Sequence, residues 1–314
     1  MNQNPTISIV SPVYNAEKSI KKLVFEIEKS LSILKISYEI ILVDDRSLDN
    51  SWSELNIISI NNPNVTAVRL SKNFGQHPAI IAGLTISKGE WIVVMDCDLQ
   101  DQPKEIEKLY NKAIEGYDIV LAKRKARKDG FVKKITSKIY TKIFNYLANS
   151  NVDSDVANFG IYNKKVIKEV LNIGDFIKAF QLFVYYTGFK TTSIFVEHAE
   201  REIGKSAYTL SKSVSLAFNA IISYSTKPLK IFITFGLLVS TLAFFGGIYN
   251  LYGYYAGSIK VLGYSSIIIS IWFFSGIIIT SIGVVGIYIG KVFEQTKNRP
   301  VFIIDEILKK NDDN

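Results

Sequence analysis

Apolar and polar positions alternate between two patterns along residues 6–122, one typical of strands and one typical of helices. Short β-branched runs, typical of buried strands, are separated by longer segments whose apolar residues recur at helical spacing. The runs predict strands at 6–11, 38–43, 65–70, 91–95 and 118–122. The segments between and after them predict helices at 17–34, 50–60, 78–87 and 103–114. This alternation indicates an α/β domain built on a mainly parallel sheet with right-handed crossovers.

The pattern changes near the C-terminus. No residue from Ile231 to Ile259 is charged, and after Lys260 the residues from 261 to 290 are again uncharged. Each run exceeds the ~20 residues that an α-helix needs to cross a bilayer. We therefore predict two transmembrane helices, over residues 231–256 and 264–290.

The basic residues around these runs set the expected orientation. Lys227 and Lys230 precede the first run, Lys291 and Arg299 follow the second, and the connection holds only Lys260. By the positive-inside rule, both flanks and both termini are expected in the cytoplasm. We see no signal-peptide pattern before the first strand, which favours the same side for the N-terminal domain.

Two further segments are amphipathic. Residues 131–149 fit either a basic membrane-surface helix or a core-facing helix with a solvated lysine face. Residues 206–228 lead directly into the first apolar run, which favours an interfacial position. The expected organisation is a cytoplasmic domain at 1–205, the interfacial helix, a transmembrane hairpin at 229–291 and a tail at 292–314. A short β-like run in the tail is expected to dock on a neighbouring domain or subunit.

The composition narrows the choice of partners. The 314-residue chain has a net charge of +8 and a pI of about 9.2, so we expect anionic lipid, nucleotide phosphates or nucleic acid as partner. Cys97 is the only cysteine, which excludes an intramolecular disulfide and indicates a reducing compartment. The spacing of the two histidines suggests no zinc site. No nucleic-acid motif or paired aromatic platform supports nucleic-acid binding.

The strand at 91–95 ends in two carboxylates, Asp96 and Asp98. Ligands bind at the carboxyl ends of strands in a parallel sheet, and two carboxylates spaced in this way can share Mg²⁺ or Mn²⁺ with substrate phosphates. The alternative is a helix cap beside a solvated carboxylate. Similar polar pairs follow two other strands, at Tyr14-Asn15 and at Asp44-Asp45. Three such clusters on one sheet indicate a built site.

Motifs in a fixed order resemble those of family 2 glycosyltransferases of the GT-A fold, in the polyprenyl-phosphate glycosyltransferase branch. They lie at residues 11–17, 43–47, 72–76, 96–103, 155–159 and 201–208. The resemblance covers nearly the whole chain, including the C-terminal pair of spans. It implies a membrane-anchored, inverting enzyme that moves one hexose from a UDP- or GDP-sugar to polyprenyl (undecaprenyl) phosphate. The enzyme would work at the cytoplasmic face of a bacterial inner membrane, supply lipid-linked sugar for cell-surface glycans and form a homo-oligomer.

The same resemblance assigns roles on the donor side. Asp96 and Asp98 are the expected metal ligands, with Asp98 the catalytic one, and Gln100 and Asp101 are expected to reach toward the sugar. Asp96 also belongs to the expected donor-nucleotide set. The other members of that set are Pro12, Tyr14, Asn15, Asp44, Asp45, Asn73 and Gly75. The alternatives at these positions are turns, helix caps and surface polar residues.

On the acceptor side the resemblance implies that cations hold a lipid phosphate. Arg201, Lys205 and Ser206 match the phosphate-binding segment, and Arg124 and Arg127 are assisting candidates or part of a solvated basic loop. Many relatives carry an acidic residue where this chain has Asn158, so Asp155 becomes the candidate catalytic carboxylate. The chain lacks the Gln-x-x-Arg-Trp signature of processive synthases, which favours single-sugar transfer. The remaining alternatives are a different membrane-lipid or lipid-linked saccharide acceptor, and a non-catalytic nucleotide-sugar-binding adaptor.

Overall fold

The structure is a computed structural model, and it describes residues 4–124, 145–146, 156–173, 180–197, 225–256 and 263–310. The chain divides into two compact units. The first comprises Met1–Lys142, Ser150–Ala207 and Arg299–Asn314, and the second comprises Ile143–Asn149 and Tyr208–Asn298. Most of the two predicted amphipathic segments, 131–149 and 206–228, lies outside the described residues.

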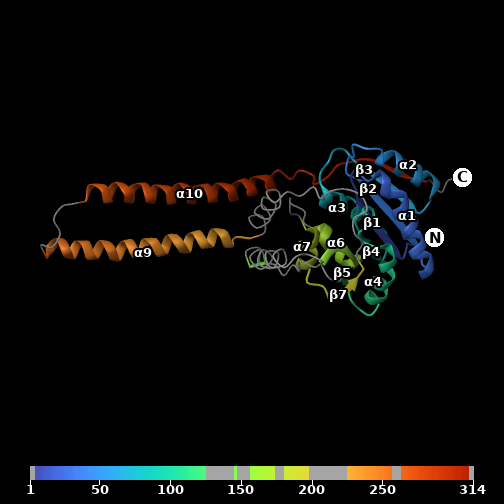
Figure 1. Cartoon of the computed structure of the whole chain (residues 1–314), viewed down its shortest axis with the longest axis horizontal. Coiled ribbons are helices and arrows are strands. Elements are labelled where there is room, and N and C mark those ends of the chain that lie inside the picture. The colour runs from blue at the N-terminus through green and yellow to red at the C-terminus, as the bar shows by residue number, and fades with distance from the viewer. Residues whose placement is uncertain are drawn as a thin grey trace. The chain divides into compact units, whose positions relative to one another are not determined.

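An eight-stranded sheet forms the first unit (Figure 1). Its order is β7-β5-β6-β4-β1-β2-β3-β8. Strands β1 to β4 run parallel to one another, β5 and β7 are parallel, and β6 and β8 are antiparallel to their neighbours. The strands are β1 Ile7–Val13, β2 Tyr38–Asp44, β3 Val65–Leu70, β4 Trp91–Val94, β5 Ile119–Arg124, β6 Val156–Asn163, β7 Thr191–Val196 and β8 Ile304–Lys309. The predicted mainly parallel α/β sheet is confirmed.

Helices cover both faces of this sheet. One core joins α1, α2 and α4 to the face that carries Ile7 and Ile9, whereas α3 packs against the opposite face, beside Val10. This arrangement follows from the alternation of side chains along a strand. The helices are α1 Glu17–Leu34, α2 Ser51–Asn61, α3 Gln76–Ile86, α4 Ile106–Ala113, α6 Lys164–Asn172 and α7 Phe180–Tyr186.

Most predicted elements agree with the structure to within a few residues, and the differences have local causes. The segment predicted as one helix at 103–114 begins as a short 3-10 helix, Pro103–Glu105, before α4. Proline suits the first helical position because its missing N–H is not needed there. Strand β1 continues to Val13, two residues beyond the expected end, because β2 pairs with it as far as Asp44.

Helix α3 lies unusually close to the sheet at Gly83. A Cβ atom placed on Gly83 would lie 2.5 Å from Cγ1 of Val10 and 3.1 Å from Cγ2 of Val43. Only glycine therefore fits here without a shift of the neighbouring side chains. This close contact fixes the second half of α3 against β1 and β2.

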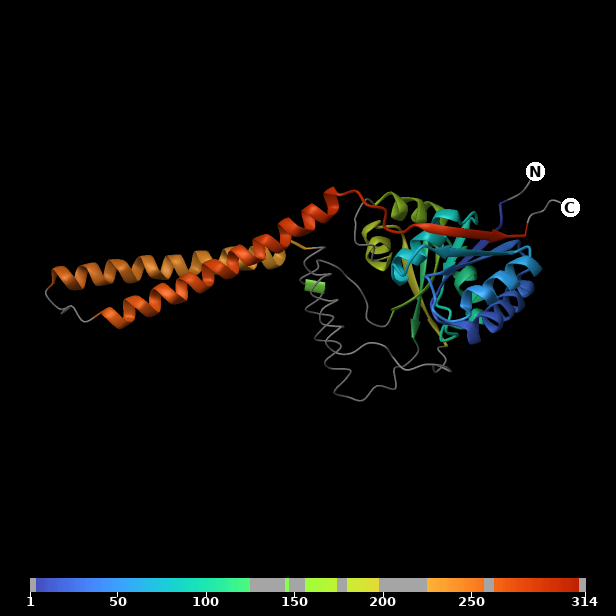
Figure 2. The same ribbon diagram turned by 90° about the horizontal axis from the view of Figure 1, so that it is seen from above.

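The C-terminal residues return to this sheet. Strand β8 pairs antiparallel with β3, and the amide of Ser71 donates to the carbonyl of Ile303 at 2.9 Å. In Figure 2, β8 is the red arrow along the sheet edge. The tail was expected to dock through a β-like run at 301–304, and the strand instead begins at Ile304.

The second unit contains two long helices, α9 Lys227–Tyr255 and α10 Tyr264–Thr296. Their apolar windows, Lys227–Gly246 and Ser270–Thr296, are long and apolar enough to cross a membrane, and no part of either window is buried within the chain. The hydroxyl of Tyr288 donates to the carbonyl of Ser225 at 2.8 Å, which ties α10 to the residues just before α9. The two predicted apolar helices are confirmed.

Candidate active site

A cavity of about 700 Å³ opens at the carboxyl ends of the parallel strands. Its walls come from the ends of β1, β2 and β4 and from the starts of α1 and α3. Most of the residues predicted to bind donor or metal line it, namely Pro12, Tyr14, Asn15, Asp45, Asn73, Gly75, Asp96 and Asp98. The prediction that these dispersed positions meet in one place is therefore supported by the geometry.

Asp45 joins the loop after β2 to the loop after β3. Its Oδ1 accepts a hydrogen bond from the amide of Phe74 at 2.7 Å, and its Oδ2 accepts one from the amide of Gly75 at 2.8 Å. Burial raises the pKa of the Asp45 carboxyl above its ordinary value of 3.8, although the two amide donors oppose the shift. Gly75 has a φ of +100°, a left-handed conformation that glycine adopts without strain.

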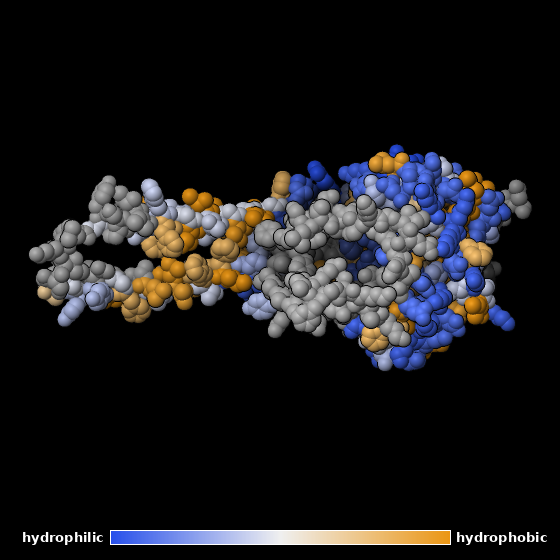
Figure 3. Space-filling model, in the orientation of Figure 1, coloured by the Kyte–Doolittle hydropathy of each residue, from blue (hydrophilic) through white to orange (hydrophobic). Residues whose placement is uncertain are grey.

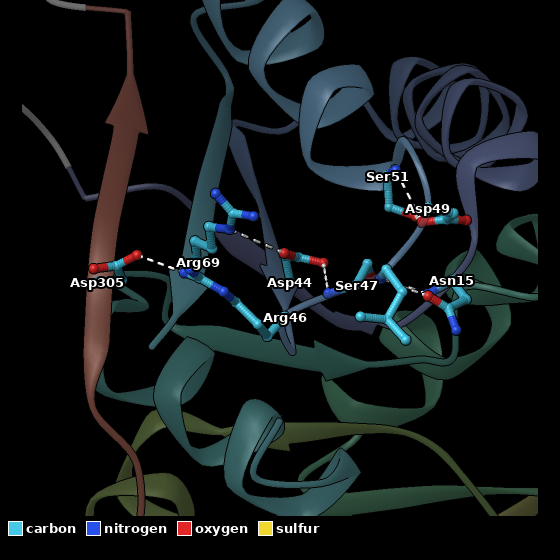
Figure 4. Close-up of polar contacts among 9 residues, drawn as sticks. Asn15, Asp44, Arg46, Ser47, Asp49, Ser51, Arg69 and Asp305 are labelled. Carbon is cyan, nitrogen blue, oxygen red and sulfur yellow. Dashed lines mark hydrogen bonds and ion pairs between the residues drawn. The ribbon is translucent and has the colours of Figure 1, made fainter. Parts of the chain in front are cut away.

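The loops after β1 and β2 are fastened together by backbone-to-side-chain hydrogen bonds (Figure 4). The amide of Asn15 donates to Oγ of Ser47 at 3.0 Å, and Oδ1 of Asn15 accepts from the amide of Leu48 at 2.8 Å. The amide of Ala16 donates to Oγ of Ser51 at 2.8 Å. These contacts hold Tyr14 and Asn15, at the mouth of the cavity, in a fixed position relative to Asp45.

A single carboxylate, that of Asp49, serves the first turns of two helices. Its Oδ1 accepts from the amide of Ser51 at 3.0 Å, and its Oδ2 accepts from the amide of Glu17 at 3.2 Å. In return, Oε2 of Glu17 accepts from the amide of Asn50 at 3.1 Å. Asp49 therefore caps the start of α2 and also binds the start of α1, more than thirty positions earlier in the chain.

Strained backbone conformations gather around the cavity. Asn15, Arg46 and Leu99 have φ values of 51°, 58° and 61°, and each follows a different parallel strand. Residues other than glycine rarely adopt this backbone conformation. Where they do, often at functional sites, the surrounding structure typically holds them in it. With Gly75 after β3, the loops after β1, β2, β3 and β4 each contain one such residue.

Asp96 and Asp98 line the floor of the cavity directly after β4. Oδ1 of Asp96 accepts from Nε2 of Gln76 at 2.7 Å, and Oδ1 of Asp98 accepts from the amide of Gln100 at 3.1 Å. The described residues contain no cluster of three or more metal-ligating side chains. Two carboxylates still fit Mg²⁺ or Mn²⁺, because such ions commonly take one or two carboxylates, water and substrate phosphate oxygens.

Cys97 lies between these two carboxylates and also lines the cavity. Burial, with a further contribution from the charge of Asp96, raises the pKa of the Cys97 thiol to about 12. The thiol is therefore neutral near pH 7, as expected for a small residue at a strand end and not for a nucleophile.

Three of the residues predicted on the donor side do not line the cavity. Asp44 is buried, with Oδ1 accepting from the amide of Ser47 at 3.1 Å and Oδ2 lying 3.6 Å from Nε of Arg69. Asp101 is also buried, and its Oδ2 lies 3.5 Å from the amide of Asp96. Gln100 contacts Asp98 through its backbone. Asp44 and Asp101 thus support the loops that carry Asp45 and Asp96.

The expected acceptor residues cannot be placed in the same way. Asp155, Arg201, Lys205, Ser206 and Arg127 lie outside the described residues. Arg124 ends β5, where its backbone pairs with Val196 of β7. Residues that the sequence did not single out include Ser47, Ser51 and Gln76. Ser47 and Gln76 lay in the motifs at residues 43–47 and 72–76, whereas Ser51 lay in none.

Comparison with known proteins agrees with this geometry. Residues 8–171 match the family described as Glycosyl transferase family 2. The chain belongs to that family. The expected family resemblance and the expectation of an enzyme that transfers a sugar are thereby confirmed.

Relatives match over nearly the full length of the chain. A prophage bactoprenol glucosyl transferase homolog of Escherichia coli is 33% identical, covering 96% of this chain and 99% of the relative. An undecaprenyl-phosphate 4-deoxy-4-formamido-L-arabinose transferase of Yersinia pestis is 30% identical, covering 96% and 93%. Glucosyl-3-phosphoglycerate synthase from Mycobacterium tuberculosis, crystallised with Mn²⁺, UDP and phosphoglyceric acid, shares the fold. Its TM-score is 0.50 at 15% identity, over 70% of this chain and 77% of that one.

Proposed function

We propose that this glycosyltransferase moves one sugar from a UDP- or GDP-sugar to undecaprenyl phosphate at the cytoplasmic face of the membrane. The observation that carries the proposal is the acidic cavity at the carboxyl ends of β1, β2 and β4, in a chain that also has two long apolar helices. Relatives that match nearly the whole chain are named for transfer to the same class of lipid phosphate.

The donor nucleotide is proposed to occupy the part of the cavity between Tyr14 and Asp45. Asp45 is one of the few buried carboxylates of the sheet domain, and its oxygens hold the loop of Asn73 and Gly75 beside it. A carboxylate at such a position is suited to accept an N–H of a base or a ribose hydroxyl. The fold relative from Mycobacterium tuberculosis was crystallised with UDP, which is consistent with a nucleotide in this kind of cavity.

Asp96 and Asp98 would hold Mg²⁺ or Mn²⁺ against the donor diphosphate. When bound, the ion neutralises the diphosphate and stabilises the departing nucleoside diphosphate. The chain's own part is to orient the two carboxylates. Gln76 fixes one oxygen of Asp96, and the amide of Gln100 fixes one oxygen of Asp98. Asp101 supports this floor through the amide of Asp96.

The acceptor would need positioning more than deprotonation. A phosphate monoester has a second pKa near ~6 and is largely dianionic at neutral pH. One of its oxygens attacks the anomeric carbon from the face opposite the diphosphate, so that the carbon–diphosphate bond breaks and the configuration inverts. Arg201, Lys205 and Ser206, assisted by Arg124 and Arg127, are the proposed phosphate ligands, and Asp155 is the proposed carboxylate near them.

The test is a transfer assay on the purified full chain in detergent. Radiolabelled UDP- and GDP-sugars are offered singly with undecaprenyl phosphate and Mn²⁺ or Mg²⁺, and label is counted in the organic phase. We expect label from one donor, none without undecaprenyl phosphate, and none after addition of EDTA. Nucleotide-sugar binding without transfer from any donor would contradict the proposal and favour a different acceptor or a non-catalytic adaptor.

The acceptor half of the proposal has its own test. Arg201→Ala is expected to raise the KM for undecaprenyl phosphate while leaving donor affinity close to that of the unaltered chain, because an arginine binds phosphate through paired donors. A loss of donor affinity alone would contradict this role for Arg201.

A further inference from the structure

Strand β8 pairs with β3, and the loop that follows β3 lines the proposed donor site. The chain leaves the first unit at Ala207, runs through the apolar helices and returns at Arg299. Strand β8 then pairs with β3, with Glu306 opposite Arg69 and Ile304 opposite Leu70. The strand that follows the second apolar helix is therefore part of the sheet whose strand ends line the cavity.

One side chain of β8 contacts the loop after β2. Oδ2 of Asp305 lies 2.7 Å from Nη1 of Arg46, a charged hydrogen bond between residues 259 positions apart (Figure 4). The two side chains are 48% and 40% exposed. Both residues belong to the first compact unit.

Arg46 lies between the two residues through which this loop contacts the loops after β1 and β3. It lies between Asp45, which accepts from the amides of Phe74 and Gly75, and Ser47, whose Oγ accepts from the amide of Asn15. Its φ of 58° is in the left-handed region, which a residue other than glycine occupies only when its surroundings hold it there. The side chain of Arg46 is anchored at the far end by Asp305.

A second arginine ties the same loop to the neighbouring strand β3. Nε of Arg69, on β3, lies 3.6 Å from Oδ2 of Asp44, and its guanidinium lies 5.2 Å from the centroid of the Trp52 ring. Oδ1 of Asp44 accepts from the amide of Ser47. The loop that carries Asp45 is thus held by two contacts, a buried one between Asp44 and Arg69 of β3 and an exposed one between Arg46 and Asp305 of β8.

We propose that β8 is a working part of the donor site and that Asp305 is a positioning residue for nucleotide-sugar binding. Asp305 acts through Arg46, holding the turn in the conformation that presents Asp45 to the cavity and joins Ser47 to Asn15. The inference rests on the proposed function, because it takes the nucleotide to lie against Asp45. Through Asp305, the strand that follows the apolar helices would contribute to donor affinity.

The test is a double-mutant cycle on the full chain in detergent. Arg46→Asn and Asp305→Asn each remove one charge, and asparagine tolerates the left-handed conformation at position 46. UDP and GDP are titrated calorimetrically, and KM is measured for sugar donor and lipid acceptor separately. We expect each variant to weaken donor binding by about two- to five-fold, as for an exposed ion pair, with the acceptor KM unchanged. The double variant should be no weaker than either single one, since both remove the same contact.

Two controls separate this role from general stabilisation. Lys309→Gln removes a charge elsewhere on β8, at the position opposite Thr66. No ion pair between Lys309 and the loop is found among the described residues, so this variant should leave donor affinity unchanged. Combining Arg46→Asp with Asp305→Arg restores a pair of opposite charges and should recover most of the donor affinity. High salt should reduce the difference between the unaltered chain and Asp305→Asn.

The results distinguish a failure of this inference from a failure of the proposed function. If Asp305→Asn lowers the melting temperature but leaves the donor KM and nucleotide affinity unchanged, Asp305 is only structural and the inference is wrong. Additive losses in the double variant would equally contradict the proposed contact. If the unaltered chain binds neither UDP nor GDP nor any of their sugars, the proposed function itself fails, and that result is distinct from a selective failure of the variants.

Discussion

The two units of this chain use the same kinds of residues in opposite ways. In the sheet domain, Ile9, Val10 and Ile41 are fully buried or nearly so, and polar residues collect at the strand ends. In α9 and α10, Leu242, Phe244 and other large apolar side chains face outward, as the orange surface in Figure 3 shows for these helices. The first pattern folds in water, because burial itself supplies the driving force. The second is the pattern of helices long and apolar enough to cross a membrane, where lipid would replace water around them.

The glycines show the same contrast. Gly83 permits a contact that no other residue could make without displacing Val10, whereas a Cβ on Gly283 would meet nothing within 4 Å among the described residues. In the sheet domain, close packing therefore restricts which residue is tolerated at a position such as Gly83. In α9 and α10, length and apolarity matter more than any single contact within the chain.

Removing one carboxylate should break the function of the sheet domain while leaving both units folded. Asp98→Ala is expected to reduce sugar transfer by about 100- to 1,000-fold, because it removes a proposed metal ligand that acts on developing charge. The transfer assay measures this loss, and circular dichroism with thermal melting checks the fold. Near-normal transfer by this variant would overturn the assignment of the metal site.

Two exposed isoleucines test the comparison directly. Ile33 on α1 and Ile279 on α10 are 65% and 69% exposed. Ile279→Arg should disfavour membrane insertion by about 2.5–3.5 kcal/mol, because the arginine would be placed in hydrocarbon. Ile33→Arg should change stability by no more than about 0.5 kcal/mol, because that surface faces water. A membrane-insertion assay reads the first variant and thermal unfolding the second. Equal tolerance of both substitutions would show that α10 is not surrounded by lipid.

A pair of glycine variants sharpens the contrast in packing. Gly83→Ala forces a Cβ to within 2.5 Å of Val10, and we expect a net loss of about 1–2 kcal/mol after the better helix propensity of alanine is counted. That loss corresponds to a fall of about 2–8 °C in the melting temperature of a domain of this size. Gly283→Ala should cause no fall. A fall with Gly283→Ala would instead reveal a tight contact made by α10 outside this single chain.

The smallest effect concerns pH. Because the pKa of Asp45 is raised in the folded state, the folded chain holds the proton of Asp45 more tightly than the unfolded chain does. The free energy of unfolding contributed by this group should therefore fall as pH rises from about 4 through the folded-state pKa. Asp45→Asn lacks this titration. From about pH 4 to pH 7, the melting temperature of the unaltered chain should fall relative to that of Asp45→Asn. A constant difference between the two melting temperatures would contradict the shift.

Local pattern was enough to predict most elements. The bounds of α1 and β3 agree with the expected 17–34 and 65–70, because helical spacing and β-branched runs depend only on neighbouring residues. The start of α3 was placed two residues late, at Pro78, whereas the helix begins at Gln76. The carbonyl of Gly75 accepts from the amide of Ala79, and the side chain of Gln76 donates to Asp96, and neither contact could be expected from the local pattern. The position of β8 was also missed, since its register depends on β3.

The sequence by itself determined the fold class, the two long apolar helices and the presence of carboxylates at the strand ends. All of these follow from periodicity and composition, which are properties of short stretches of chain. Only the tertiary structure decided how the carboxylates divide their work. The pleat of β2 turns Asp44 into the protein toward Arg69, and the next residue, Asp45, lines the cavity. Only the tertiary structure, too, brought Asp305 to Arg46 and Asp49 to the amide of Glu17 in α1, because these contacts join residues far apart in the sequence.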